Sequence, residues 1–369
     1  MRQNRRVLRL SPSSPLRAGL IALAVVALTG CSTVGYYAQA VRGHLAMLSA
    51  ARPVDELLAD PATEQRLRAQ LEKARAMRAF AARELALPDN RSYTAYADLK
   101  RPAVVWNVFA VPELSLRLKT WCYALFGCAG YRGYFAQADA EATAAQLRAE
   151  GFDVNVGPVP AYSTLGWMEW AGGDPLLNTF IFWSEGELAR LIFHELAHQV
   201  LYVNDDTVFN ESFATAVERA GVRRWLAAHG DAAAREAYAR YEERRADFLA
   251  LLLAHKAQLA VVYADTAADD DDKRARKREV FDRLQRGYRG LRDGKWGGFA
   301  GYDRWFAQPL NGAHLAAVGA YNDLVPAFEA LLARVNGDLP KFYDEVKRIG
   351  ALPRETRRIE LSAMHSSPR

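Results

Sequence analysis

The chain has 369 residues, of which half are hydrophobic and a quarter are charged, so it can bury the core of one large domain or two smaller ones. Five of its 48 basic residues lie before Cys31, and those that remain match the 43 acidic residues in number. A chain balanced in this way lacks the concentrated basic charge of nucleic-acid-binding proteins, so we expect no nucleic-acid partner.

Residues 1–30 predict a lipoprotein signal peptide. Residues 2–17 contain five arginines and no acidic residue, and the apolar run Ala18–Leu28 follows shortly before Cys31. A basic segment followed by a short apolar run is typical of a secretory signal. Eleven apolar residues are too few to cross a bilayer, which needs about 20. The ending LTGC resembles a lipobox, in which the cysteine is lipidated. We expect a protein anchored through Cys31 and facing the periplasm, and the resemblance implies the outer membrane because Ser32, rather than Asp, follows the cysteine.

Residues 31–369 are expected to form a single domain with a mainly helical α+β fold. Residues 36–100 read as helical, with a long helix at Thr63–Leu87 that ends before a proline. Residues 101–230 are expected to contain a small sheet followed by the zinc site, and residues 231–369 are expected to be helical again.

Three extended runs predict the small sheet. Val104–Val111, Phe152–Val156 and Thr179–Trp183 are rich in β-branched and aromatic residues and have Gly or Pro at their borders. Two long helices are expected later in the chain, at Ala232–Tyr263 and Arg274–Leu291. We interpret the acidic run Asp269–Asp272 between them as a solvated turn whose charges favour the next helix, rather than as a cation site.

Cys122 and Cys128 are separated by five residues. In an oxidising compartment such a close pair indicates a disulfide. A metal-binding or redox pair is the alternative, but the spacing does not match CxxC chemistry.

The segment 184–201 predicts a helix that carries metal ligands. Ser184 and Glu187 have the spacing of a capping box. His194 and His198 are four residues apart, so a helix places both imidazoles on one face. With Glu195 beside them they form an HExxH motif, in which two histidines bind Zn²⁺ and the glutamate takes a proton from water.

A catalytic zinc site needs a third protein ligand. Residues 204–207 predict a turn, in which Asp or Thr can cap a second helix. That helix offers Glu211 and, seven residues later on the same face, Glu218. From the residues alone either glutamate could be the ligand, and the other could orient a histidine.

The sequence FNESFATAVERAG resembles the second helix of gluzincin peptidases and is nearest to the NExFAxxxE pattern of alanyl-aminopeptidase-like enzymes. In those enzymes the glutamate after asparagine is the third ligand, which implies Glu211. The spacing from His198 to Glu211 is shorter here than in those groups, and spacing alone would choose Glu218.

Most of the mature chain resembles a family of bacterial lipoproteins described as putative aminopeptidases. The likeness rests on the lipobox, the stretch around Cys122 and Cys128, the segment Ala161–Trp167, the HExxH helix and NESFA. It implies a zincin-like catalytic core and a peptide substrate.

The resemblance also implies an oxyanion donor downstream of the ligands. Tyr302, His314 and Tyr321 are candidates, and we favour Tyr321. Residues 162–167 could bind a substrate backbone by β-addition or form an ordinary turn. An aminopeptidase also needs a carboxylate for the substrate amine, for which the sequence offers Glu169 and Asp174.

We therefore predict a zinc metallopeptidase, with an aminopeptidase as the first choice. An endopeptidase acting on envelope proteins and a non-catalytic zinc-binding envelope scaffold are the alternatives.

Overall fold

The computed structural model describes residues 35–123, 127–161, 164, 172–204, 206–318 and 323–366. The signal peptide and Cys31 therefore lie outside the described residues. Contacts divide the chain into two units, one before Met47 and one from Met47 to Arg369. Residues 35–46 of the first unit are helical, and everything below concerns the second unit.

Helices dominate the second unit, so the chain has a mainly helical α+β fold with small sheets. In chain order they are α2 (Val54–Ala59), α3 (Gln65–Leu85), α4 (Gln137–Ala149), α5 (Glu185–His198), α6 (Thr207–Ala228), α7 (Ala232–Ala264), α8 (Asp270–Gly290), the π-helix η2 (Leu291–Lys295), α9 (Asp303–Phe306), α10 (Gly312–Ala316), α11 (Val325–Arg334), α12 (Leu339–Gly350) and α13 (Arg354–Ser366).

Within the described residues the strands all precede α5, as the sequence predicts, but they form more than one sheet. They are β1 (Ala51–Pro53), β2 (Ala95–Ala97), β3 (Val105–Pro112), β4 (Trp121–Tyr123), β5 (Gly127–Ala129), β6 (Arg132–Tyr134), β7 (Phe152–Val159) and β8 (Leu176–Leu177). Their orders are β1-β2-β8, β6-β3-β7 and β4-β5.

Two of the three predicted strands are confirmed. β3 and β7 pair antiparallel over their full length, with Val105 opposite Val159 and Pro112 opposite Phe152. The third prediction, Thr179–Trp183, is wrong, because these residues form tight turns in which Ile181 donates its backbone N–H to the carbonyl of Leu177. Phe180 and Ile181 are buried in the core without strand pairing, whereas Phe182 is exposed.

Cys122 and Cys128 form a disulfide. They lie opposite each other in the β4-β5 hairpin. The predicted pairing is therefore present in the structure.

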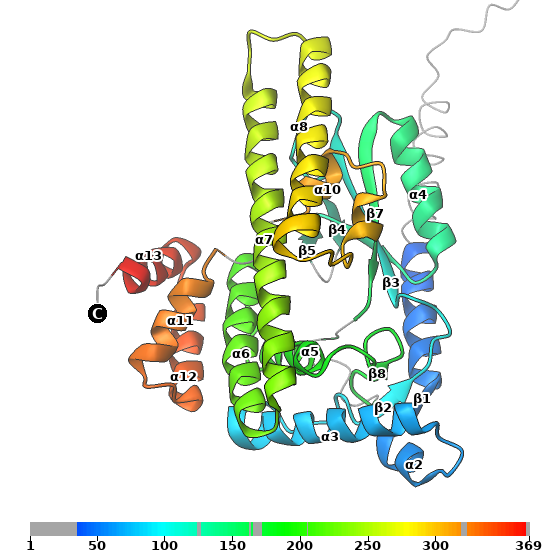
Figure 1. Ribbon diagram of the computed structural model, residues 1–369, viewed down its shortest axis with the longest axis vertical. Helices are drawn as coiled ribbons and strands as arrows, with labels where there is room; N and C mark the ends of the chain where they lie inside the picture. The colour runs from blue at the N-terminus through cyan, green and yellow to red at the C-terminus, as the bar shows by residue number, and fades with distance from the viewer. Residues whose placement is uncertain are drawn as a thin grey trace, which may run out of the picture. The chain divides into compact units, whose positions relative to one another are not determined.

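The two long helices form the α7–α8 hairpin, which stands beside the β6-β3-β7 sheet (Figure 1). α8 begins earlier than the sequence predicts, because Asp269 is its N-cap and accepts from the backbone N–H of Asp272. The acidic run thus belongs largely to the first turn of α8, where carboxylates favour the positive end of the helix. By length and composition alone α7 could cross a membrane, but such helices also occur in the cores of soluble proteins.

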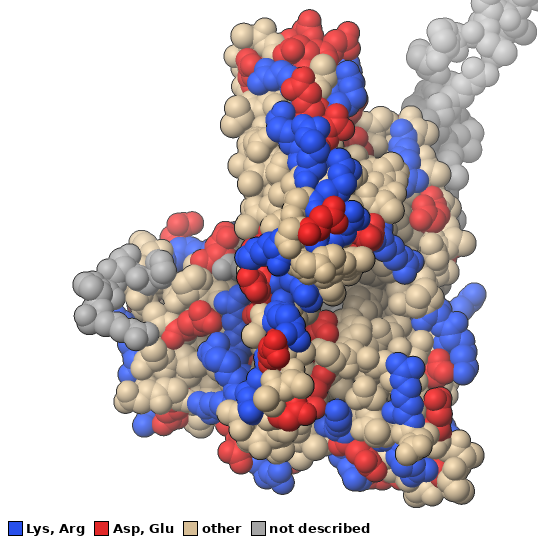
Figure 2. All heavy atoms as spheres, viewed as in Figure 1, with Lys and Arg blue, Asp and Glu red and all other residues tan. Residues whose placement is uncertain are grey.

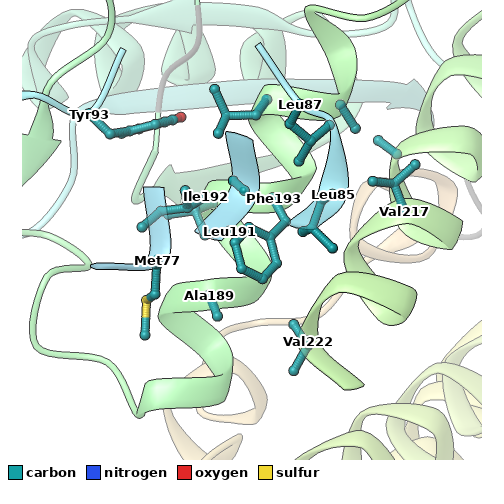
Figure 3. Packing of buried hydrophobic residues seen from close by; sticks show 14 of the residues in the cluster. Met77, Leu85, Leu87, Tyr93, Ala189, Leu191, Ile192, Phe193, Val217 and Val222 are labelled. Atoms are coloured by element: carbon teal, nitrogen blue, oxygen red, sulfur yellow. The ribbon is translucent and has the colours of Figure 1, made fainter. Parts of the chain in front are cut away.

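The main core surrounds α5 and α6, which pack side by side and are covered by α3 (Figure 1). Phe193 of α5 and Leu85 of α3 lie together in this core (Figure 3). They approach Gly221 of α6 so closely that a Cβ there would lie 2.7 Å from Leu85 and 2.8 Å from Phe193. This tight packing fixes the position of α5 along α6. The candidate site lies between these two helices.

Candidate metal centre

α5 begins at Glu185, directly after Ser184, as the sequence predicts. Ser184 does not cap the helix backbone; its hydroxyl lies 2.5 Å from the Glu187 carboxylate instead. Leu188, Ile192 and Leu196 are fully buried and hold one face of α5 in the core. His194 and His198 are thereby set at the boundary of that core, next to α6.

The link between α5 and α6 is short and is tied by two polar side chains. The Asn210 amide pairs with the backbone of Val203, donating to its carbonyl and accepting from its N–H, each at 2.8 Å. Asp206 is the N-cap of α6 and accepts from the Phe209 N–H at 3.2 Å. Both side chains are buried, so the turn returns α6 to α5 in a fixed position and brings Glu211 to the histidines.

Three side chains converge where α5 meets α6. The Nε2 atoms of His194 and His198 lie 3.1 Å apart. The Glu211 carboxylate lies 3.3 Å from Nε2 of His194 and 3.7 Å from Nε2 of His198. A tetrahedral ion with bonds of about 2.0–2.1 Å separates its ligand atoms by about 3.3 Å. These three residues could therefore hold a metal ion.

Glu218 occupies the opposite side of His194. Its Oε2 lies 2.8 Å from Nδ1 of His194 and 3.2 Å from the guanidinium of Arg190. The Glu218 side chain is 1% exposed, whereas that of Glu211 is 31% exposed. The two glutamates are thus separated by position: Glu211 faces the Nε2 atoms and Glu218 holds the far side of one ring.

The charges around the two histidines favour a protonated His194 beside ionised Glu211 and Glu218. Burial alone lowers the pKa of His194, but hydrogen bonds to Glu211 and Glu218 outweigh it and raise the pKa to about 10. Burial, and then the charge on His194, lower the pKa of His198 to about 4. Burial opposes ionisation of both glutamates, yet His194 keeps their pKa values below the ordinary value. A bound cation would replace the proton that His194 carries.

Glu195 is half-buried, and the loop before β2 contacts α5 through Gln199. Gln199, one turn after Glu195, contacts Asn90 at 2.5 Å and Ser92 at 3.2 Å. Residues four apart share a helix face, so the next residue, Tyr93, lies near Glu195. Consistent with this, burial and then the charge of Glu195 raise the pKa of the Tyr93 phenol.

The loop that carries Tyr93 is braced by Asp174. Tyr93 has φ of +62°, which is uncommon for a bulky residue, and its N–H donates to the Asp174 carbonyl at 2.7 Å. The Asp174 carboxylate is buried and accepts from the Thr164 N–H at 3.0 and 3.1 Å. Asp174 therefore braces this loop, and its burial argues against the amine-binding role that the sequence left open for it.

Other predicted site residues lie away from the ligands or outside the described chain. Tyr302 stacks on Phe248, with ring centroids 4.1 Å apart. His314 completes a capping box with Asn311 in α10 and is buried. Neither contacts a metal ligand within the described part of the chain. Tyr321, Glu169 and nearly all of 162–167 are outside the described residues.

Two residues beside the ligands were missed by the sequence analysis. Arg190 lies one turn before His194 on α5 and pairs with Glu218. Tyr202 follows His198 by four residues, and its ring meets that of His198 at 6.1 Å between centroids and 70°. The only sequence signal for either was its spacing from the histidines along the chain.

The molecular face in Figure 2 is hollowed beside α7, at the level where Figure 1 places α5. Uncharged atoms form most of this hollow, whereas charged groups cover the hairpin above it.

A protein-family model described as "Putative aminopeptidase" matches residues 35–361. The match spans the Cys122–Cys128 hairpin, α5, α6 and the helices that follow. No curated protein and no solved structure matches the chain significantly.

Proposed function

Because the chain belongs to the putative-aminopeptidase family, we propose that it is a zinc-dependent aminopeptidase. The observation that carries the proposal is the convergence of His194, His198 and Glu211 on one point between α5 and α6. Two imidazoles and one carboxylate are the donor set of catalytic zinc sites that keep a fourth position for water. We propose that these three residues hold Zn²⁺ in a zincin-like core.

Glu195 is the proposed general base. When bound, zinc would polarise the scissile carbonyl and lower the pKa of water. Glu195 follows the first ligand on α5, so its carboxylate is carried on the same rigid helix as both imidazoles. It takes the proton of the attacking water and passes it to the leaving amine.

Glu218 and Arg190 act by positioning. Glu218 accepts the Nδ1 proton of His194, which turns the Nε2 lone pair toward the ligand site. Arg190 keeps Glu218 ionised, since burial opposes that charge but the nearby guanidinium and His194 favour it.

Two further parts of the proposal rest on sequence alone. Tyr321 is the donor predicted for the oxyanion, and Cys31 is the predicted site of lipid attachment. With a lipid on Cys31, the enzyme would act on peptides from the periplasmic face of a membrane, and the resemblance to lipoproteins with serine after the cysteine favours the outer membrane.

The proposal is tested by metal content and by the Glu195→Gln variant. The full-length protein, purified in detergent, should contain about one zinc per chain and hydrolyse members of a mixed peptide library. Glu195→Gln should keep the zinc and lose about 100- to 10,000-fold in activity, since it removes the proton acceptor. Glu187→Gln, on the same helix but bound to Ser184, is the matched control and should stay within about twofold of the wild type.

The alternatives give different results in the same assays. Equal cleavage of a free-amine peptide and its acetylated twin would replace the aminopeptidase with an endopeptidase. Zinc binding without any hydrolysis, and a cellular role that survives Glu195→Gln, would indicate a scaffold.

A further inference from the structure

Tyr202 is an exposed aromatic residue at the edge of the ligand group. It is 44% exposed, and its ring meets the His198 ring edge-on, with centroids 6.1 Å apart. It lies in the short link between α5 and α6, next to Val203, whose backbone is hydrogen-bonded to Asn210.

The neighbours of Tyr202 explain why its ring turns toward His198. Leu201 and Val203 both point at α12, where a Cβ on Gly350 would lie 3.0 Å from Leu201 and 3.2 Å from Val203. The Val203 backbone is held on both sides by Asn210. Since the residues before and after Tyr202 are fixed against α12, its side chain is directed away from them, beside the metal ligands.

Among the residues that the structure describes, the carboxylates paired with the two histidines and the guanidinium beside Glu218 offer no free donor for negative charge. Glu211 and Glu218 are acceptors when ionised. Arg190 is occupied by Glu218. A phenol, by contrast, donates a hydrogen bond and is suited to an oxygen that becomes negative as water adds to a carbonyl.

We propose that Tyr202 is a catalytic residue whose hydroxyl donates a hydrogen bond to the oxygen of the scissile carbonyl. The inference rests on the proposed peptidase function. Water adds to the carbonyl carbon, its proton passes to Glu195 and then to the leaving nitrogen, and the C–N bond breaks. Tyr202 keeps its own proton throughout and stabilises the charge on the carbonyl oxygen.

The Tyr202→Phe variant removes only the hydroxyl. In the full-length, zinc-loaded protein we expect kcat on free-amine tripeptides to fall about 100-fold, with KM and zinc content little changed. Tyr131→Phe is the matched control, because Tyr131 is 40% exposed and also meets an aromatic ring, that of Phe109 in the β6-β3-β7 sheet. It should behave like the wild type.

Tyr321→Phe separates the two tyrosines that could fill this role. A loss of kcat in Tyr321→Phe with full activity in Tyr202→Phe would overturn the proposal and assign the donor to Tyr321. A rise in KM alone for Tyr202→Phe would also overturn it, because the hydroxyl would then bind substrate and transition state equally.

Binding of a phosphinic dipeptide distinguishes this proposal from the peptidase function itself. The phosphinate resembles the tetrahedral state, so Tyr202→Phe should weaken its binding about 10- to 100-fold by calorimetry, while Tyr131→Phe should not. Should the wild type bind the phosphinate but hydrolyse no peptide, the peptidase function fails while the Tyr202 contact stands. Equal phosphinate binding by wild type and Tyr202→Phe, or none by either, would reject the Tyr202 contact.

Discussion

His194 carries a partner on each ring nitrogen. Nδ1 faces Glu218 at 2.8 Å, while Nε2 faces His198 and Glu211. The two glutamates are seven residues apart on α6 and contact different nitrogens of the His194 ring: Glu218 contacts Nδ1 and Glu211 contacts Nε2. The NESFA motif points to Glu211, which lies with both histidines in the group that could hold a metal ion, whereas spacing alone chooses Glu218.

The proton on His194 predicts how metal binding depends on pH. With a pKa of about 10 for His194 and about 4 for His198, the metal-free site at pH 6 holds one charged and one neutral imidazole. Metal binding needs both neutral, so it should release about one proton per ion. Because the His194 pKa is raised, affinity should climb about tenfold per pH unit from pH 6 toward 10.

Calorimetry at pH 6 in two buffers of different ionisation heat measures this release. Glu218→Gln provides the control, since a neutral amide supports the imidazolium less and should reduce the number of protons released. Binding without proton release in the wild type would mean that His194 is neutral in the free protein.

At the scale of elements, the turn between α5 and α6 sets the ligand geometry. The Asn210 side-chain amide makes two hydrogen bonds to Val203, accepting from its backbone N–H and donating to its carbonyl. The asparagine of the Asn-Glu pair thus closes the link, and the glutamate after it lies beside both histidines.

Asn210→Ala should lower the free energy of unfolding by about 3 kcal/mol, because it leaves a buried N–H and C=O without partners. It should also weaken zinc binding at least tenfold, since Glu211 is no longer held in register with α5. Urea unfolding and zinc titration measure the two effects.

Asn178→Ala is the matched control for that pair of measurements. Asn178 also makes two backbone hydrogen bonds, accepting from the Leu99 N–H and donating to the Arg101 carbonyl, but it lies outside the link. We expect a similar loss of stability with unchanged zinc affinity. Equal loss of zinc affinity in both variants would show that stability, rather than the turn, limits binding.

At the scale of the whole molecule, the C-terminal helix holds the start of α6. Asp206, the N-cap of α6, is 2% exposed and pairs with Arg357 and Arg358 of α13 at 3.1 and 3.0 Å. Residues more than 150 positions apart thus meet at the foot of the helix that bears Glu211.

Arg357→Met should destabilise the fold by about 3 kcal/mol, because Arg357 is itself buried and its loss leaves buried Asp206 with the ion pair to Arg358. Urea unfolding of the full-length protein measures the change. Arg348→Met is the control: Arg348 is 49% exposed and pairs with Glu345 and Glu360 at the surface, so its loss should cost less than about 1 kcal/mol. Equal effects of the two substitutions would contradict a special role for the Asp206 contact.

The sequence by itself determined features that depend on local physics. Helical periodicity located α3, α5, α7 and α8, strand composition located β3 and β7, and cysteine spacing predicted the disulfide. The four-residue interval of His194 and His198 placed both rings on one face, because every α-helix has this geometry. These conclusions need only the period of the helix or strand and the nearest neighbours along the chain.

Only the tertiary structure decided what depends on distant contacts. Residues 179–183 are apolar enough for a strand but form turns that bury Phe180 and Ile181, since burial and strand pairing favour the same residues. The separate positions of Glu211 and Glu218, the pairing of Arg190 and the direction of Tyr202 all follow from how α5 packs on α6. That packing is set by residues remote in sequence, such as Leu85, Gly221 and Gly350, and no local pattern records it.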